Sequence, residues 1–471
     1  MKKYIHEAMT FLASVKLALF LLFTLAVTSI IGTIVPQNEA PGLYVQLYGP
    51  NLARLMQTLS IPDMYNAWWF IALLGLFSLN LIVCSIQRIP NAWRLATMDN
   101  LETDPQRLGK MGLRQEVAGG GTVTEAAEKA ATHLAAKGWK TSRREREGGI
   151  LLFAQKGAWT RFGVYIVHSS ILIILVGAII GSPRIASNLL KDPTHAFKGS
   201  IMIPETRQTD VIYPYMEEVG QIPLGFTIRC DYFGIDYYSN GMPKEYRSTL
   251  SVIENGEVVL QKDIVVNDPL VYKGITFYQS SYQPYQDFIV TVRNNATGAD
   301  RTELIPPARQ TAWQEGGVRY GIANMEKRGD VVQRLKIWFT DDQGEPSTFW
   351  VEPNREAIVK RPSGEYSIRA KQLYATGLQV ARDPGVWWVY IGCGLMMIGL
   401  LVAFFMSHRK VWAFVSEKDG KVTVLFAGSA NKNKPGFEKT FAALLAGVDT
   451  GRKEQPREYL HPKPFILRDA Q

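Results

Sequence analysis

Cysteine is scarce in this 471-residue chain, which contains only Cys84, Cys230 and Cys393. The three lie far apart, so no CxxC pair occurs, and the long segment from residue 182 to residue 384 holds a single thiol. A paired thiol active site and a disulfide within that segment are therefore excluded. Cys84 and Cys393 lie in apolar runs, where a cysteine is expected to serve as a small packing residue.

The chain also lacks the sequence motifs of the common catalytic and nucleotide-binding folds. It has no Walker loop, no GxSxG, no HExxH and no GxGxxG. The sequence therefore contains no motif that indicates nucleotide hydrolysis or ordinary hydrolytic chemistry. The carboxylates between residues 182 and 384 are numerous but follow no pattern, as expected of solvated strand faces. We predict no catalytic residues and do not expect the chain to act as an enzyme alone.

Long uncharged apolar runs are the feature that the sequence has in excess. Four of them are long enough, at about 1.5 Å per residue, to cross the roughly 30 Å hydrocarbon core of a bilayer. They cover residues 17–35, 67–86, 162–181 and 385–406. The first run follows a basic start, as in a signal peptide, but no A-x-A site follows it, so we predict a retained anchor. The sequence predicts a membrane protein with four transmembrane α-helices.

Basic residues are unevenly distributed among the segments between these runs. Segments 1–16, 87–161 and 407–471 carry 28 Lys and Arg against 16 Asp and Glu, whereas 36–66 and 182–384 carry 24 against 27. By the positive-inside rule the first set is cytosolic, which places both termini in the cytosol. The net charge of +9 thus reports topology, and no basic patch with interleaved aromatic residues indicates nucleic acid.

Turn signals and periodicity predict the domains between the spans. Residues 122–157 have the pattern of a small α+β module that opens with a capping box of Thr122 and Glu125. Residues 182–384 alternate with period two and contain turns such as Asn255–Gly256, which predicts a large all-β, sandwich-like domain. The expected order is an N-terminal anchor and first span (1–35), a short outer loop (36–66), the second span (67–86), a cytosolic α+β module (87–161), the third span (162–181), an extracytoplasmic β domain (182–384), the fourth span (385–406) and a cytosolic tail (407–471).

Of the six histidines, His168 is the only one inside a predicted span. It is the seventh residue of a helix that enters from the cytosol, which places it about 9 Å along the axis, in the inner third of the bilayer. Two interpretations are open for it. A neutral imidazole can ligate haem iron or another metal, or it can hydrogen-bond to Asn80 or Ser85 of a neighbouring helix. His408 lies just beyond the fourth span, where an interfacial residue beside Arg409 is the alternative to a ligand.

Five blocks of the sequence, in chain order, allow comparison with a known family. They are IGTIVPQ after the first span, NLIVCSIQRIP at the end of the second, GVYIVHSSILIILVGAIIGS in the third, VNDPLVYKGITFYQSSY in the long outer segment and DPGVWWVYIGCGLMMIGLLVAFFMSHRKVW in the fourth. Together they resemble ResB-type cytochrome c biogenesis proteins of system II. The resemblance implies a membrane partner of the CcsA (ResC) type. With it, such a protein carries haem b across the membrane and supports its attachment to CxxCH motifs of apocytochrome c.

The resemblance also implies that His168 is an axial haem ligand, with metal bound only through the haem iron. His408 is a second candidate haem-binding residue. The chain lacks the tryptophan-rich segment of the partner, so we expect a component of a holocytochrome c synthase complex that does not complete the reaction alone. Thiol-reducing proteins of the same pathway are further candidate partners. The alternative is a scaffold or apocytochrome chaperone that binds no haem, and a third reading, a thiol reductant, conflicts with the missing cysteine pair.

Overall fold

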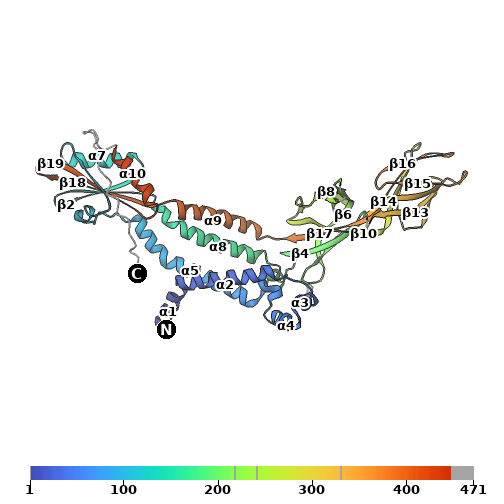
Figure 1. Cartoon of the computed structure of the whole chain (residues 1–471), viewed down its shortest axis with the longest axis horizontal. Coiled ribbons are helices and arrows are strands. Elements are labelled where there is room, and N and C mark those ends of the chain that lie inside the picture. Colours follow the sequence, from blue (N-terminus) through green and yellow to red (C-terminus); the bar gives the residue numbers. More distant parts are fainter. Residues whose placement is uncertain (1, 217–218, 240–241, 329–330, 447–471) are drawn as a thin grey trace, which may run out of the picture. The chain divides into compact units, whose positions relative to one another are not determined.

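The computed structural model describes residues 2–216, 219–239, 242–328 and 331–446 (Figure 1). The chain divides into two compact units, of which one contains residues 1–174 and 390–471 and the other residues 175–389. The predicted tail at 407–471 therefore lies in the described part of the chain only as far as residue 446.

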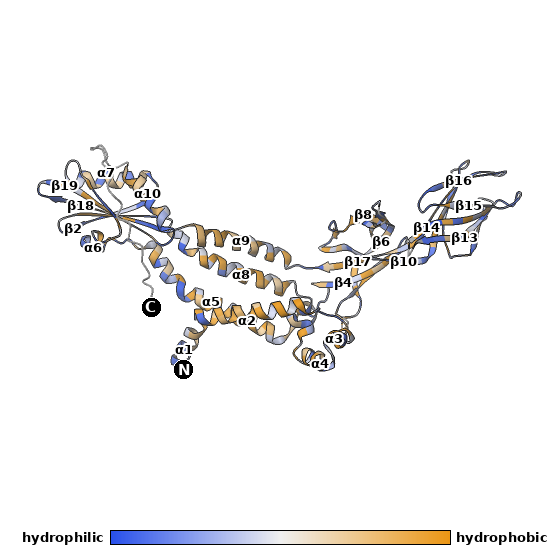
Figure 2. Ribbon diagram, viewed as in Figure 1, coloured by the Kyte–Doolittle hydropathy of each residue, from blue (hydrophilic) through white to orange (hydrophobic). Residues whose placement is uncertain are grey.

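Within the described residues, four helices are long and apolar enough to cross a membrane, which confirms the predicted number of spans. They are α2 (Val15–Ile34), α5 (Trp68–Thr97), α8 (Gly163–Ile180) and α9 (Val386–Phe405). Figure 2 shows that hydrophobic residues predominate along them. Helix α5 does not end at Pro90 but runs on to Thr97, because a single proline is tolerated in a membrane helix that neighbouring groups support.

Helices α2 and α5 pack through an apolar core that contains Leu21, Leu25, Phe70, Phe77 and Leu81. A short helix, α1 (Lys2–Leu12), precedes α2. At the break between α1 and α2, the buried amide of Asn80 donates hydrogen bonds to the carbonyls of Leu12 and Ser14, at 2.5 and 3.2 Å. Asn80 therefore stabilises the contact between these helices, as polar groups within membrane helices commonly do.

Helices α8 and α9 approach closely at glycine positions. A Cβ atom at Gly399 would lie 2.8 Å from Val167 Cγ2, and one at Gly392 would lie 2.9 Å from the carbonyl oxygen of Ser170. Small residues at such positions allow membrane helices to pack with their backbones close together. Val167 and Ser170 of α8 thus face α9. His168 lies on a different face of α8, which contacts Ser85 of α5.

Between α2 and α5 the chain folds into a small helical cap. It consists of α3 (Pro41–Tyr48), α4 (Pro50–Thr58) and the 3₁₀ helix η1 (Ile61–Asn66). Its core contains Val35, Tyr44, Ala53 and Met56. The hydroxyl of Tyr44 donates a hydrogen bond of 2.8 Å to the Pro36 carbonyl, which fixes the cap to the chain that leaves α2.

The segment that precedes α8 and the segment that follows α9 in the sequence form one α+β domain. Its five-stranded antiparallel sheet has the order β1–β19–β18–β3–β2, so strands that follow α9 lie between strands that precede α8. The strands are β1 (Leu113–Ala118), β2 (Lys140–Arg146), β3 (Gly149–Lys156), β18 (Arg409–Lys418) and β19 (Lys421–Ala430). This shared sheet was not predicted, because the separate segments carry no sequence signal for their pairing.

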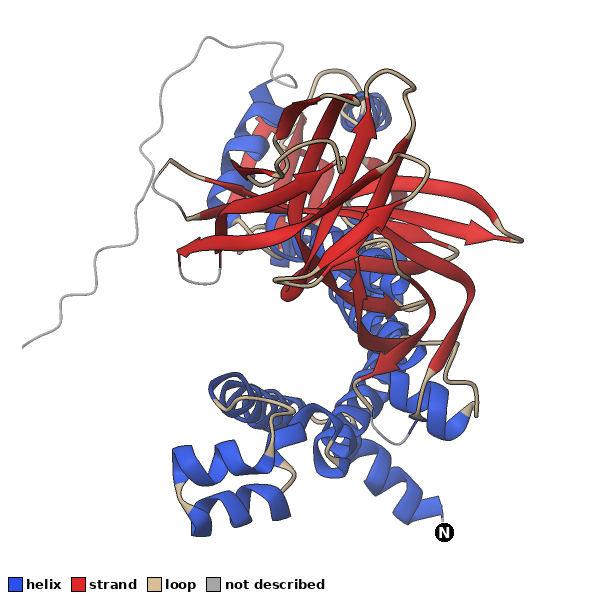
Figure 3. Ribbon diagram, turned by 90° about the vertical axis from the view of Figure 1, so that its right-hand side faces the viewer, coloured by secondary structure: helices blue, strands red, loops and turns tan. Residues whose placement is uncertain are grey.

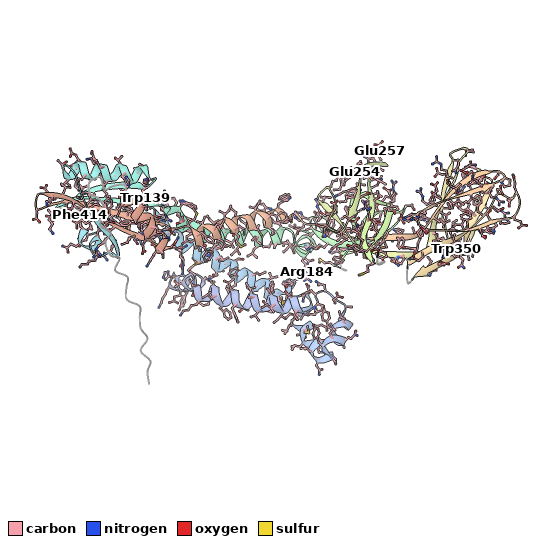
Figure 4. All side chains as sticks on the ribbon, turned by 45° about the horizontal axis from the view of Figure 1, so that its top comes forward. Trp139, Arg184, Glu254, Glu257, Trp350 and Phe414 are labelled. Carbon is pink, nitrogen blue, oxygen red and sulfur yellow. The ribbon has the colours of Figure 1, made fainter. Side chains whose placement is uncertain are left out.

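Helices cover the sheet of the α+β domain. Helices α7 (Val123–Ala136) and α10 (Lys434–Ala446) pack on one face, around a core that includes Trp139. The short helix α6 (Pro105–Leu108) adds to the core on the other face, against which Phe414 packs. Figure 4 labels both aromatic residues. The predicted capping box of Thr122 and Glu125 is present at the start of α7.

Antiparallel strands dominate the second unit, which confirms the all-β prediction (Figure 3). In the described residues, a ten-stranded sheet has the order β11–β10–β17–β4–β5–β6–β7–β8, with β16 beside β17 and β9 beside β10, and a four-stranded sheet has the order β12–β13–β14–β15. The bounds are β4 (Phe197–Pro204), β5 (Gln208–Pro214), β6 (Ile222–Tyr237), β7 (Pro243–Glu254), β8 (Glu257–Val265), β9 (Leu270–Tyr272), β10 (Ile275–Asn294), β11 (Asp300–Ile305), β12 (Gln310–Trp313), β13 (Val318–Arg328), β14 (Val331–Thr340), β15 (Ser347–Val351), β16 (Glu356–Arg361) and β17 (Gly364–Arg382).

The long strands β10 and β17 contribute to two separate cores. One core, which includes Phe233 and Phe277, is formed with β4 to β9. The other, which includes Tyr320 and Ile368, lies between the long strands and the four-stranded sheet, as in a sandwich. The register of the β10–β17 pair shifts between Pro284 and Phe288, where the strands pass from one core to the other.

Candidate functional site

His168 lies on the face of α8 that contacts α5. Its Nδ1 is 2.9 Å from the hydroxyl oxygen of Ser85, and the side chain is half-buried. The ring of Tyr165, one turn earlier, stands edge-to-face with the imidazole at a centroid distance of 6.2 Å. Among the residues that the structure describes, no hydrogen-bond partner is present for Nε2.

The hydrogen bond at Nδ1 determines which ring nitrogen can bind a metal. When Nδ1–H donates to the serine hydroxyl, Nε2 carries the free lone pair. Metal-ligating histidines usually have their second ring nitrogen held in this way, which fixes both the tautomer and the ring orientation. Of the two partners that the sequence suggested, Ser85 makes this contact, whereas Asn80 bonds to backbone carbonyls elsewhere. The geometry suits an axial ligand, and it also suits a packing residue with one hydrogen bond.

The surroundings of His168 fit haem better than a bare metal ion. Among the described residues, no group of three or more His, Cys, Asp or Glu side chains is placed to hold a metal ion. A structural or catalytic zinc needs three or four protein ligands. Haem iron is already held by the porphyrin and takes only axial ligands from protein, so a single histidine can bind it.

His408 is buried, and both of its ring nitrogens are engaged. Arg161 Nε donates a hydrogen bond of 2.7 Å to Nδ1, and Nε2 lies 2.9 Å from Gln155 Oε1. Since Nδ1 accepts, Nε2 carries the proton, and the imidazole is neutral. Burial, assisted by the charges of Arg161 and Lys410, lowers the pKa of His408 to about 4. The ligand role of His408 stays a prediction, and it requires one of these two bonds to break.

The low pKa of His408 predicts that the α+β domain loses stability in acid. In the unfolded chain a histidine titrates near pH 6.5. Between pH 6.5 and pH 4 the unfolded state therefore binds a proton that the folded state does not, and the free energy of unfolding falls by up to about 3 kcal/mol across this window. Urea denaturation of the wild type and of His408→Gln from pH 7 to pH 4 measures this effect. We expect the difference between them to shrink as the pH falls, and a constant difference would contradict the assignment.

A buried ion pair in the β domain carries no sequence signal. Lys371 Nζ lies 2.5 Å from Glu205 Oε1, donates to the Phe233 carbonyl at 2.7 Å and sits 4.1 Å from the centroid of the Tyr232 ring. Burial raises the pKa of Glu205 and lowers the pKa of Lys371, and the attraction between the two opposes both shifts. The partners are 166 residues apart in sequence, so no motif could reveal them.

Lys371 borders a cleft of about 640 Å³ in the β domain. Its other lining residues come from β6, β14, β17 and the turn after β15, and they include Ile235, Arg334, Asn354 and Tyr374. The cleft lies where the two cores of the β domain meet along β17. Its walls combine charged and polar side chains with the aromatic rings of Phe233 and Tyr374.

All three cysteines are free thiols, as the sequence predicted. Cys230 is buried in the β domain, and burial raises its pKa to about 12. A thiol with such a pKa is a poor nucleophile. Cys84 is partly buried on α5, next to Ser85, and Cys393 is exposed on α9.

Comparison with known proteins places the chain in a family. The model described as the ResB-like family matches residues 15–316 and 335–442. A protein named cytochrome c biogenesis protein CcsB from Gloeobacter violaceus is 30% identical over 467 residues, which cover 95% of this chain and 92% of that protein. Proteins of the same name from Synechococcus sp. (strain JA-3-3Ab) and Crocosphaera subtropica are 28% and 27% identical, over 93% and 95% of this chain and 90% and 96% of their own lengths. The match includes the long apolar helices, most of the β domain and both halves of the α+β sheet, and the chain therefore belongs to the ResB-like family.

Proposed function

We propose that this chain is the haem-handling subunit of a cytochrome c assembly complex and that His168 is an axial ligand of the haem iron. One observation carries the proposal: the single histidine of the four apolar runs is bonded at Nδ1 to Ser85 and has no partner at Nε2 among the described residues. This arrangement is usual for axial histidines, whose second ring nitrogen is commonly held by a hydrogen bond. The relatives named cytochrome c biogenesis protein CcsB support a role in the same process.

A second protein completes the haem site in this proposal. This chain offers one intramembrane histidine, whereas a low-spin haem takes two axial ligands. A CcsA/ResC-type membrane protein supplies the second ligand, and the pair carries haem b across the bacterial cytoplasmic membrane to the CxxCH motifs of apocytochrome c. Thiol-reducing proteins of the same pathway keep the cysteines of these motifs available for attachment.

The β domain lies outside the membrane in this proposal, and the α+β domain lies in the cytosol. The excess of basic residues in segments 1–16, 87–161 and 407–471 supports this orientation. The β domain then docks the partner or the apocytochrome. Trp350, labelled in Figure 4, is 38% exposed on β15, with Arg334 and Lys336 at 5.5 and 6.0 Å from its ring centroid. Exposed tryptophan beside arginine is typical of docking surfaces.

Replacing Ser85 by alanine tests the proposed role of the Nδ1 hydrogen bond. Without the hydroxyl the imidazole loses its fixed orientation, and loss of such a supporting partner lowers metal affinity by about 10–100-fold. We expect the complex of Ser85→Ala with the CcsA-type partner to bind haem at least about tenfold more weakly in a titration followed by visible absorption.

Ser78→Ala is the matched control for this experiment. Ser78 lies two turns earlier on the same helix, and its hydroxyl donates only to the carbonyl of Leu74. Its replacement should leave haem affinity unchanged. Equal affinities for Ser85→Ala and Ser78→Ala would remove the support for a ligand held by Ser85.

The alternative function is that of a scaffold or apocytochrome chaperone that binds no haem. The hydrogen bond to Ser85 also favours this function, because it is sufficient to account for His168 as a packing residue. In that case the Ser85→Ala and His168→Ala complexes keep the haem content of the wild type. Deletion of residues 182–384 then abolishes cytochrome c assembly although the intramembrane substitutions do not.

A further inference from the structure

In the described part of the chain, two cations at the ends of the α8–α9 pair have no carboxylate within salt-bridge distance. Arg161 belongs to the 3₁₀ helix η2 (Ala158–Phe162), directly before α8, and Lys410 lies in β18, shortly after α9 ends at Phe405. Both side chains are half-buried. Among the described residues, neither has a carboxylate within salt-bridge distance. Unpaired cations of this kind are costly to bury, so they indicate an anion that the protein itself does not provide.

Neutral His408 holds Arg161 in place. Its Nδ1 accepts the Nε–H of the guanidinium at 2.7 Å, and its Nε2–H donates to Gln155 Oε1 at 2.9 Å. Only one edge of the guanidinium is used in this way. In the part of the chain that the structure describes, its two terminal nitrogens have no hydrogen-bond acceptor. A fork of this geometry matches two oxygen atoms of a phosphate or carboxylate group.

Lys410 adds a second positive charge nearby, since it is paired across the β3–β18 ladder with Gln155, the residue that contacts His408. Its Nζ lies 5.8 Å from the centroid of the Phe153 ring, and no hydrogen bond to it occurs among the described residues. Burial and the neighbouring charge of Arg161 lower the pKa of Lys410. An anion between Arg161 and Lys410 would relieve this repulsion.

Three arginines of the same domain have carboxylate partners, in contrast to Arg161 and Lys410. Arg144 and Arg146 both form ion pairs with Glu102. Arg143 lies 3.7 Å from Glu128. The three arginines of residues 143–146 therefore each have a carboxylate partner.

The position of the two cations identifies the source of the anion. Arg161 lies in the first turn of the candidate membrane span Ala158–Ile180, directly before α8, and Lys410 closely follows the span Val386–Phe405. Trp159, two residues before Arg161, is 52% exposed, and Trp93 of α5 is 62% exposed. The Trp93 ring contacts that of Phe162, with 5.9 Å between the centroids. Exposed tryptophan at the end of a membrane helix typically marks the headgroup level, and basic pockets there bind anionic headgroups.

We propose that Arg161 and Lys410 bind the phosphate of an anionic phospholipid at the membrane boundary. The guanidinium contributes two parallel hydrogen bonds and the ammonium adds its charge, while His408 keeps the guanidinium oriented. A zwitterionic lipid has its own cation close to the phosphate, so the site favours phosphatidylglycerol over phosphatidylcholine. The site requires neither haem nor a partner protein, and its test is therefore independent of the proposed function.

Native mass spectrometry of the full-length chain in detergent tests this site. The probes are dioleoyl phosphatidylglycerol and dioleoyl phosphatidylcholine, each titrated into wild type, Lys410→Gln and the Arg161→Gln/Lys410→Gln double variant. With each basic group near a membrane surface contributing a factor of about five, we expect phosphatidylglycerol affinity to fall about fivefold in Lys410→Gln and about thirtyfold in the double variant. Phosphatidylcholine binding should stay the same in all three.

Arg143→Gln is the matched control, because it removes one basic charge from the same domain at an exposed, acid-paired position. Its phosphatidylglycerol affinity should equal that of the wild type. Lys410→Gln breaks no hydrogen bond of the described structure, so it remains informative if the double variant fails to fold. The proposal is overturned if Lys410→Gln keeps wild-type affinity, if Arg143→Gln loses as much as Lys410→Gln, or if millimolar inorganic phosphate displaces the lipid completely.

Discussion

Replacing His168 by alanine is expected to lower the yield of mature cytochrome c by more than about a hundredfold while the protein still reaches the membrane. The expectation follows from the size of ligand effects, since losing only the group that orients a metal-bound histidine costs about 10–100-fold in affinity. Removal of the imidazole deletes an axial ligand outright. The cavity that it leaves is small and half-exposed, so α8 should still pack against α5 and α9.

The measurement is haem staining of c-type cytochromes in cells that depend on the variant, with an immunoblot for its amount in membranes. His6→Ala is the control, because His6 is an exposed histidine on α1 whose ring has no hydrogen bond in the described structure. It should support wild-type maturation. Normal cytochrome c levels with His168→Ala would refute the ligand role, whereas loss of the variant from the membrane would show that the substitution acts through folding.

Lys371→Met is expected to destabilise the β domain by about 3–5 kcal/mol, because it leaves the Glu205 carboxylate buried without its cation. Lys371 and Glu205 are 8% and 2% exposed, so solvent cannot replace the lost partner. The second carboxylate oxygen, Oε2, already lacks a hydrogen bond in the described structure. The ammonium also bonds to the Phe233 carbonyl, and that contact is lost as well.

Pulse proteolysis of the full-length chain in urea measures the effect on the β domain. Lys371→Met should lower the urea midpoint strongly, and the Lys371→Met/Glu205→Leu double variant should recover most of the loss, because a buried ion pair is often replaceable by apolar side chains. Lys360→Met is the control: Lys360 pairs with Glu365 at 3.8 Å on an exposed surface. A Lys371→Met midpoint equal to that of Lys360→Met would show that the pair contributes little.

The sequence alone predicts the membrane helices and singles out the candidate site residue His168, because both signals are local. Uncharged runs of sufficient length predicted all four helices. His168 stood out because an imidazole is rare in such a run. Ser85 was a candidate hydrogen-bond partner because it is a polar residue of a neighbouring span. The capping box at Thr122 is equally local, since both of its residues lie within one turn.

The features that sequence reasoning missed depend on contacts between distant segments. Strand β18 pairs with β3, although the whole β domain lies between them in the sequence. The alternation of apolar and polar residues within each strand does not show which strand is its neighbour. Glu205, in the turn after β4, and Lys371, in β17, are each unremarkable charges in the sequence, and only the fold buries them together. The contact of His408 with Arg161 joins residues 247 positions apart, so the sequence suggested the interface but not the neutral, buried ring.

The most direct test of the account is the visible absorption spectrum of the full-length chain purified with its CcsA-type partner, compared between wild type and His168→Ala. The account predicts a low-spin haem spectrum that appears only when both the partner and His168 are present, because each protein supplies one axial ligand. A haem spectrum of the complex that is unchanged in His168→Ala would contradict it, leaving His168 as a residue that packs α8 against α5.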